Sequence, residues 1–294
     1  MANLRKRLST NVDGNFFVDS TCINCDTCRQ LAPASFQEKG DYSSVYRQPE
    51  NAGEELEAYR ALLACPVGSI GAVKKEKGHL TQATESFPHH LEGEVNYNGF
   101  NSEKSFGASS YFLHHPDGNW LIDSPRYSPH LVDAFAQMGG IRYIFLSHED
   151  DVAEASRYAK RFNATRIIHQ ADSEAMPGAE WIVSGSDPVP VAPGFYLIPV
   201  PGHTPGSMAL LYNNRYLFTG DHLWWDRESR TLQAPSVYVW SDGSLHQSTQ
   251  GLLDLRFEWV LPGHGDRIRL PGPEMKAALH RLLKRWSDTA DRRA

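Results

Sequence analysis

The chain has 294 residues, of which 40% are hydrophobic and 22% charged, and its formal net charge at neutral pH is −6. This is the composition of a globular protein of one or two domains, with enough apolar residues for a sizeable core. A nucleic-acid-binding protein would carry a strong basic field, which this chain lacks, and no apolar run is long enough to span a bilayer. We therefore expect neither a nucleic-acid partner nor a membrane partner.

All four cysteines lie in the first quarter of the chain, as Cys22-x-x-Cys25-x-x-Cys28 and then Cys65 followed by proline. The first ten residues are basic and contain no apolar stretch of the kind found in secretory signals. Cysteines clustered in this way, without such a signal, favour metal ligation in a reducing compartment over disulfides. We therefore expect a cytoplasmic protein.

This cysteine triplet, closed by a distant Cys-Pro, resembles that of bacterial-type ferredoxins, which hold iron–sulfur clusters with thiolates. In two-cluster members the triplet is followed by three other residues and then by a further cysteine, which serves the second cluster. Here that position is Ala32, although Pro33 still follows it. The resemblance therefore implies one [4Fe–4S] cluster bound by all four cysteines. A zinc site made of the same thiolates is the alternative.

Composition and periodicity divide the chain into two parts joined by a polar connector. Apolar residues at helical spacing predict a helix over Glu54–Ala64. The polar run that follows Val73 is typical of a linker or a crossing strand. We therefore expect a small domain over residues 1–77, a linker over residues 78–90 and a larger domain over residues 91–294.

The larger part alternates short apolar runs with helical segments. Tyr111–Leu113 and Trp120–Ile122 flank a Pro-Asp-Gly-Asn sequence, and such turn residues between apolar runs predict a hairpin. Further elements are predicted from the same patterns: strands over residues 141–146, 196–200, 208–212, 216–219 and 257–261, and helices over residues 152–162 and 273–286.

Three Gly-rich fragments each place a histidine or an aspartate at the end of a predicted strand; they contain His203, Asp221 and His264. Together with His148, which follows an earlier strand, they resemble the metallo-β-lactamase fold of glyoxalase II-like hydrolases and flavodiiron proteins. The resemblance covers roughly Leu91–Gly265. It implies an αββα sandwich after an α+β ferredoxin-like domain. It also implies that His203, Asp221 and His264 are metal ligands.

The first metal motif of that family, His-x-His-x-Asp-His, is altered here. His148 keeps the first position, and Asp150 replaces the second histidine. Val152 and Ala153 occupy the last two ligand positions, and neither side chain can bind a metal. The loss of these two ligands argues against the usual two-metal site.

Two interpretations of the altered motif stay open. In one, at most one ion binds tightly, through residues that include Asp150. In the other, nearby carboxylates compensate: Asp150 and Glu154 would share a helix face, with Asp151 beside them. A carboxylate-rich site favours iron or manganese over zinc in either case. We expect the ligands to be His148, Asp150, His203, Asp221 and His264, with Asp150 and Asp221 taking part in catalysis.

Two other kinds of residue are candidates for a role beside these ligands. His222 follows Asp221 directly and is either a further ligand or a hydrogen-bond donor to one. Three arginines, Arg126, Arg227 and Arg230, would suit an anionic substrate, although a solvated charge is the default for each.

A ferredoxin domain fused to a hydrolase would have no electron-transfer role, since hydrolysis consumes no electrons. We therefore expect a redox metalloprotein whose cluster supplies electrons to a metal site holding one Fe, Mn or Zn ion, with a redox partner protein and a small-molecule substrate. Two alternatives stay open. One is a metal-dependent hydrolase of an ester, thioester or lactone with a structural or regulatory cluster. The other is a non-catalytic electron-transfer or sensor protein.

Overall fold

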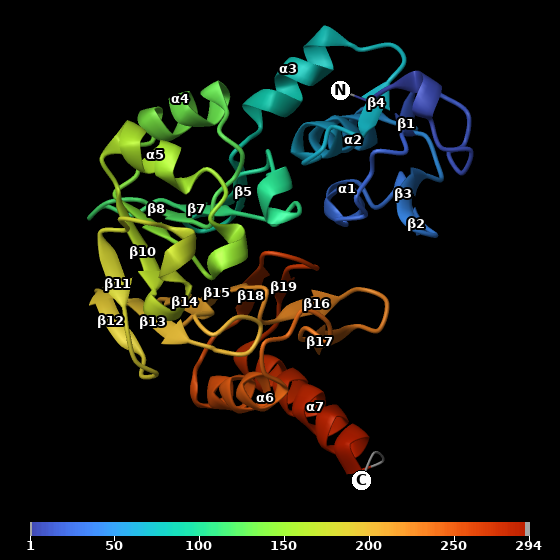
Figure 1. The fold of residues 1–294 in the computed structure, drawn as a ribbon. Coiled ribbons are helices and arrows are strands. Elements are labelled where there is room, and N and C mark those ends of the chain that lie inside the picture. The colour runs from blue at the N-terminus through green and yellow to red at the C-terminus, as the bar shows by residue number, and fades with distance from the viewer. Residues whose placement is uncertain (1, 292–294) are drawn as a thin grey trace. The chain divides into compact units, whose positions relative to one another are not determined.

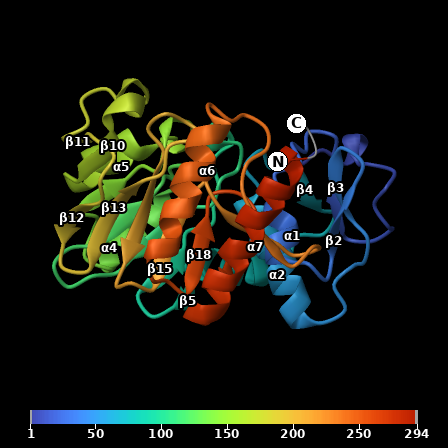
Figure 2. The ribbon, with the colours of Figure 1, turned by 90° about the horizontal axis from the view of Figure 1, so that it is seen from below.

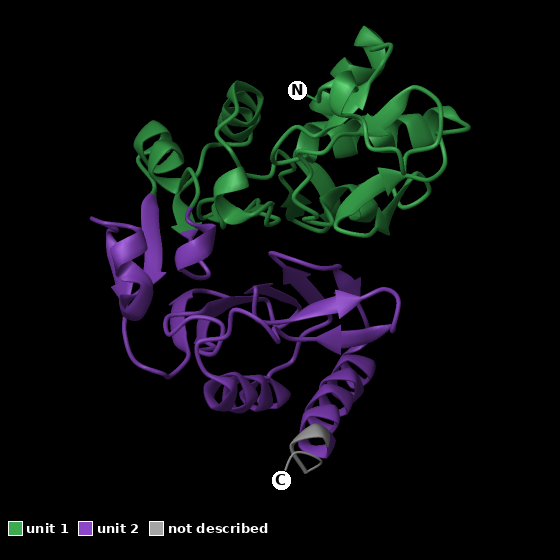
Figure 3. Cartoon of the chain, turned by 45° about the vertical axis from the view of Figure 1, so that its right-hand side comes forward, with its two compact units in different colours: residues 1–144, 153–164 green, residues 145–152, 165–294 purple. Residues whose placement is uncertain are grey.

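A computed structural model describes residues 2–291 of the chain, with side chains to residue 288. The chain forms two compact units (Figure 3): residues 1–144 with 153–164, and residues 145–152 with 165–294. This division does not follow the boundaries predicted near residues 77 and 91, which stay a prediction. Among the described residues, no helix is long and apolar enough to cross a membrane.

The N-terminal part of the first unit consists of two pairs of short strands and the helices α1 and α2 (Figure 1). Strands β1 and β4 pair antiparallel, and β2 and β3 form a hairpin. The core between them includes two of the cysteines, Cys28 and Cys65. The elements are β1 (Phe16–Val18), α1 (Thr27–Leu31), β2 (Phe36–Lys39), β3 (Tyr42–Val45), α2 (Ala52–Ala64), β4 (Ile70–Ala72) and a 3₁₀ turn, Leu4–Lys6.

Helix α2 confirms the helix predicted from the periodicity of this segment. It begins where the side chain of Asn51 accepts a hydrogen bond from Glu54 N, a usual N-cap arrangement. It ends at Cys65, because the following proline disfavours helical backbone in the residue before it. The start of the helix and the position of the fourth cysteine are thus both set by local sequence.

The segment expected to be a linker or a crossing strand is instead a helix, α3 (Lys77–Glu85), followed by strand β5 (His89–Glu92). Its single buried side chain, Ala83, packs into the core of the cysteine-containing part. The polar composition that suggested a linker is that of a helix with most of its surface in solvent.

The rest of the first unit is an antiparallel sheet in which neighbours in sequence are neighbours in space, β5–β6–β7–β8. The predicted hairpin is present as β7 and β8, with Tyr111 opposite Ile122. Helix α5 starts later than predicted, at Ala155. The elements are β6 (Val95–Tyr97), a 3₁₀ turn (Glu103–Ser105), β7 (Tyr111–Leu113), β8 (Trp120–Ile122), α4 (Pro129–Gln137) and α5 (Ala155–Phe162). Strand β9 (Tyr143–Phe145) leads into the second unit.

The second unit is built on a mixed six-stranded sheet in the order β12–β13–β14–β15–β18–β19, in which only β15 and β18 are parallel. Helix α7 packs on this sheet through Met275, Leu279 and Leu282, and α6 lies beside it (Figure 2). The strands are β12 (Val189–Ala192), β13 (Phe195–Pro199), β14 (Met208–Tyr212), β15 (Tyr216–Gly220), β18 (Trp259–Pro262) and β19 (Ile268–Arg269).

Smaller elements complete the second unit. Strands β10 and β11 form a parallel pair, and β16 and β17 form an antiparallel hairpin. The bounds are β10 (Thr165–His169), β11 (Trp181–Val183), β16 (Trp224–Asp226), β17 (Thr231–Gln233), α6 (Asp242–Gly251), α7 (Gly272–Asp291) and 3₁₀ turns at Glu149–Asp151, Gln170–Ala175 and Leu252–Asp254.

Candidate functional site

The four cysteines line one small cavity in the first unit. Two are buried and two are half-buried. Backbone N–H groups donate toward two of the sulfurs: Asn24 N lies 3.4 Å from Cys22 Sγ, and Ser69 N lies 3.3 Å from Cys65 Sγ. Hydrogen bonds to sulfur are among the contacts that tune iron–sulfur clusters. The donor set therefore fits the cluster implied by the cysteine spacing.

Burial disfavours bare thiolates in this cavity. It raises the pKa of the Cys25 thiol to about 11, and it raises the pKa of the Cys28 thiol as well. The low dielectric that penalises an isolated thiolate also strengthens its attraction to a cationic metal centre, and a coordinating thiol is deprotonated. The cavity is thus suited to thiolates that are held by metal rather than to free reactive cysteines.

The predicted ligands of the larger region meet in the second unit, each just beyond a strand. His148 follows β9, His203 lies between β13 and β14, Asp221 follows β15 and His264 follows β18. Because β15 and β18 are parallel neighbours, Asp221 and His264 leave the sheet at the same edge. The order of the three Gly-rich motifs along the chain therefore becomes proximity in the fold.

A close contact between two backbone segments brings Asp221 to His148. Gly220 has a φ of +50°, and a Cβ on it would lie 2.5 Å from Ser147 Oγ. Glycine is the residue that tolerates both this backbone conformation and this approach. The same serine contacts His148 Nδ1 at 2.9 Å and so orients the imidazole.

The side chain of Asp221 lies at the centre of the group. Its Oδ2 is 3.8 Å from the Nε2 atoms of His148 and His203 and 3.9 Å from Nε2 of His264. Asp150 Oδ2 lies 3.4 Å from His203 Nε2. Two ligand atoms that are each about 2.1 Å from one ion lie roughly 3–3.5 Å apart, so these separations are close to those of a metal site. The structure therefore brings together all five predicted ligands.

A buried nitrogen without a partner supports the same conclusion. His148 Nε2 is buried and makes no hydrogen bond, although unpaired buried polar atoms are costly. Burial lowers the pKa of His148, so the ring is neutral and its nitrogen can donate a lone pair. His203 is half-buried; desolvation alone would lower its pKa, but the carboxylates of Asp150 and Asp221 outweigh it, so the pKa of His203 is raised. Neutral imidazoles and carboxylates are the ligands of a divalent cation.

Of the carboxylates near the altered motif, Asp151 turns inward. Its side chain is 1% exposed, and a Cβ on Gly263 would lie 2.9 Å from Asp151 Oδ2 and 2.7 Å from Asp221 Oδ1. Both carboxylates therefore crowd the same side of Gly263, next to His264. The idea that Asp150 and Glu154 share a helix face is wrong, because helix α5 begins only at residue 155. Glu154 instead pairs with Lys104, 2.6 Å away.

Sequence reasoning missed Asp172, which ties two ligand loops together. It is buried, and its carboxylate accepts hydrogen bonds from Glu149 N (3.1 Å), Thr204 Oγ1 (2.5 Å) and Gly206 N (2.8 Å). Glu149 follows one histidine ligand, and Thr204 follows another. The signal in the sequence was His203-Thr-Pro-Gly-Ser. The hydroxyl of its threonine and the backbone N–H of its glycine both donate to the buried carboxylate.

His222 is not among the converging ligands. Its Nε2 lies 3.0 Å from Thr249 Oγ1, and that hydroxyl in turn donates to Leu245 O. The threonine proton is used in the second bond, so His222 Nε2 carries the proton in the first. Burial lowers the pKa of His222 to about 3. His222 is thus a neutral buried side chain that anchors the chain after Asp221 to helix α6.

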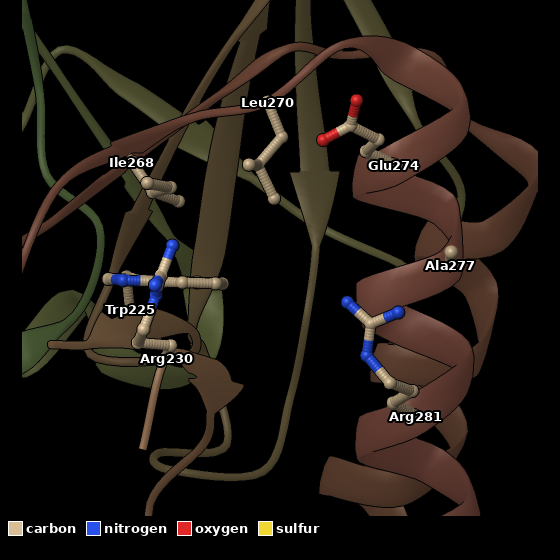
Figure 4. Close-up of a pocket in the computed structure, with 7 residues that line it drawn as sticks. All are labelled: Trp225, Arg230, Ile268, Leu270, Glu274, Ala277 and Arg281. Atoms are coloured by element: carbon tan, nitrogen blue, oxygen red, sulfur yellow. The ribbon is translucent and has the colours of Figure 1, made fainter. Parts of the chain in front are cut away.

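A hollow in this unit, next to α7, contains none of the predicted ligands (Figure 4). Of the arginines considered for an anionic substrate, Arg230 lines it, while Arg227 is paired with Asp266 at 2.6 Å. Its lining residues are Trp225, Arg230, Ile268, Leu270, Glu274, Ala277 and Arg281.

Comparison with known families assigns both parts of the chain. Residues 18–72 match the model of the 4Fe-4S single cluster domain of ferredoxin I. Residues 92–257, more than half of the chain, match the model of the metallo-beta-lactamase superfamily. The chain belongs to the metallo-beta-lactamase superfamily. The predicted fold class, a small ferredoxin-like region followed by a mixed-sheet metallo-β-lactamase fold, is confirmed, and the match to a cluster domain favours iron–sulfur over zinc at the cysteines.

Individual relatives of this superfamily member are distant. An uncharacterized protein of Bacillus subtilis, YobT, is 24% identical over 219 residues, which cover 61% of this chain and 92% of that protein. The structure is similar to the DIM-1 metallo-beta-lactamase (12% identity, 65% of this chain and 95% of that one, TM-score 0.50). It is also similar to an archaeal superfamily protein from Sulfolobus tokodaii (16% identity, 66% and 86%, TM-score 0.46). The likeness to DIM-1 describes the fold alone.

Proposed function

We propose that this protein is a redox metalloenzyme in which the [4Fe–4S] cluster supplies electrons for the reduction of a small molecule at the histidine–carboxylate pocket. The observation that carries the proposal is the buried, partnerless Nε2 of His148, which lies with His203 and His264 around the carboxylate of Asp221. A group of histidine nitrogens and carboxylate oxygens of this kind suits a divalent cation. Because this group and a cluster domain occur in one chain, a metal bound there could accept the electrons that the cluster carries.

The carboxylate content of the pocket favours iron or manganese over zinc. When bound, such an ion would polarise a coordinated substrate and, as iron, would accept single electrons. His148, His203, Asp221 and His264 would hold it. Val152 and Ala153 still argue against a second tightly bound ion. The inward Asp151, beside Asp221 and His264, supports a weaker second position.

Asp150 is the residue best placed to act on a substrate. Its side chain is 66% exposed, whereas Asp221 is 16% exposed, so Asp150 is the more accessible carboxylate. Its contact with His203 lowers its pKa, so it is ionised at neutral pH. An ionised carboxylate at this position can accept a hydrogen bond or a proton from a molecule entering the pocket.

Metal counting after anaerobic purification tests the proposal. We expect about four cluster irons plus additional iron or manganese. His203→Ala should lose only the additional metal, and Cys65→Ser should lose only the cluster iron, so each variant is the control for the other. Zinc in the pocket without redox-active metal would favour the hydrolase alternative. Four irons with an empty pocket would favour the sensor or electron-transfer alternative.

A further inference from the structure

The end of helix α2 that carries Cys65 is capped by residues of the lactamase region, within the first unit. The last carbonyls of a helix lack partners inside the helix. Here Arg126 donates through Nη2 to Leu63 O and through Nη1 to Cys65 O (3.0 Å), and Asn101 N donates to Ala64 O (3.2 Å). All three consecutive carbonyls at this helix end thus accept a hydrogen bond from outside the cysteine-containing part, and Cys65 O also accepts one from Gly68 N (3.3 Å).

The lactamase region also contacts a second ligand, Cys25. A Cβ on Gly107 would lie 2.8 Å from Cys25 Cβ and 3.0 Å from Cys25 Sγ, so the backbone of this glycine closes against the cysteine. Asn101 donates to Thr27 Oγ1 (3.0 Å) and to Gly107 O (2.7 Å). Thr27 Oγ1 lies 3.4 Å from Gly107 O, to which it donates, and also 3.4 Å from Cys25 Sγ, so its single proton is shared between these two acceptors.

The charge of Arg126 has no carboxylate beside it. Among the described residues, its side chain bonds to main-chain carbonyls and lies over the ring of Phe100, with 5.4 Å from Cζ to the ring centroid. Helix α2 has no basic residue in its last turn, so its partly negative end faces the cluster cavity without a cation of its own. Arg126 supplies that cation from another part of the chain.

We propose that Arg126 is a positioning residue of the cluster site and that its charge raises the midpoint potential of the cluster. A four-thiolate cluster is negatively charged and gains one further negative charge when it takes up one electron, with no proton required. A fixed cation near Cys65 therefore stabilises the reduced form more than the oxidised form. This inference concerns the cluster alone and does not depend on a reaction at the pocket.

Charge and hydrogen bonding are separated by two substitutions in the full-length, anaerobically purified protein. Arg126→Lys keeps the charge and loses the two-pronged donor, whereas Arg126→Gln keeps a donor and loses the charge. The midpoint potential is measured by dye-mediated titration with dithionite, followed by electron paramagnetic resonance. We expect Arg126→Gln to lower the reduced-to-oxidised ratio at a given potential at least tenfold, which is about 59 mV for a one-electron couple. Arg126→Lys should stay much closer to the parent protein.

Arg60→Gln is the matched control, since Arg60 belongs to α2 but bonds to Ser86 rather than at the cysteine end. If Arg126→Gln does not retain its cluster, Arg126→Met provides the second reading. It also removes the charge while keeping an unbranched apolar stem beside the Phe100 ring, and we expect it to lower the potential by a similar amount. Unchanged potentials in Arg126→Gln, or in Arg126→Met where the first variant lacks a cluster, would overturn the proposal.

Discussion

The buried carboxylate of Asp172 offers a sharp test of how the pocket is held together. Its Oδ2 accepts from Glu149 N and Thr204 Oγ1, and its Oδ1 accepts from Gly206 N. In Asp172→Asn, whichever way the amide is turned, its NH₂ group faces at least one backbone N–H. One hydrogen bond to a charged acceptor is lost, a buried donor is left unpaired, and the remaining bonds lose their charge assistance.

The size of the effect follows from those contacts. A hydrogen bond to a charged group contributes about 1.5–3 kcal/mol, and an unsatisfied buried donor costs about 1–3 kcal/mol. Because part of this is recovered by relaxation, we expect Asp172→Asn to destabilise the second unit by about 2–4 kcal/mol. His148 and His203 are next to the bonded residues, so metal affinity at the pocket should fall by about tenfold or more.

The assay combines calorimetric unfolding with competition against a chromophoric chelator for added Mn²⁺ or Fe²⁺. Asp187→Asn, a change of the same kind at an exposed aspartate of the same unit, is the control and should match the parent protein. An Asp172→Asn protein with parental unfolding and parental metal affinity would refute the reasoning.

Three further predictions concern the cluster, the pocket and acid sensitivity. Cys65→Ser should abolish the brown colour and dithionite-bleachable absorbance and loosen the small cysteine-containing core, as seen by absorbance and limited proteolysis; a fully coloured variant would contradict the ligand assignment. Gly263→Ala places a methyl group 2.7 Å from Asp221 Oδ1 and should reduce pocket metal in dialysed protein while leaving cluster iron unchanged. Because burial lowers the pKa of His222 from 6.5 to about 3, the unfolded chain takes up its proton first, so stability should fall as the pH drops from about 6.5 toward 3. His222→Gln should flatten that part of the stability curve, and an unchanged curve would argue against a neutral buried histidine.

Local patterns predicted much of this fold because the determining interactions are local. The turn residues between Tyr111–Leu113 and Trp120–Ile122 define a hairpin whose strands have the predicted bounds. Strand-end motifs likewise predicted that His203, Asp221 and His264 lie close together, and the structure places them so, since parallel strands and tight glycine turns convert their order into proximity. A polar surface helix such as α3, by contrast, is hard to tell from a linker by composition.

The residues that sequence reasoning missed act through contacts distant in the chain. Arg126 was expected to be solvated, yet it is half-buried and bonds to the end of α2, more than sixty residues earlier. Asp172 lies in an unremarkable polar stretch, and its role depends on two loops that only the fold brings to it. Asp151 was one of several carboxylates that could compensate for the lost metal ligands. The sequence could not show that Asp151 is buried, whereas Glu154 pairs with Lys104.

The central claim is that electrons from the cluster reach metal in the pocket, and one measurement tests it directly. The anaerobic, iron-loaded protein is given less than one equivalent of dithionite and frozen at successive times for electron paramagnetic resonance. We predict that the reduced-cluster signal appears first and then decays as the pocket iron is reduced, and that Cys65→Ser leaves the pocket iron oxidised over the same interval. A reduced-cluster signal that persists beside oxidised pocket iron would contradict the account.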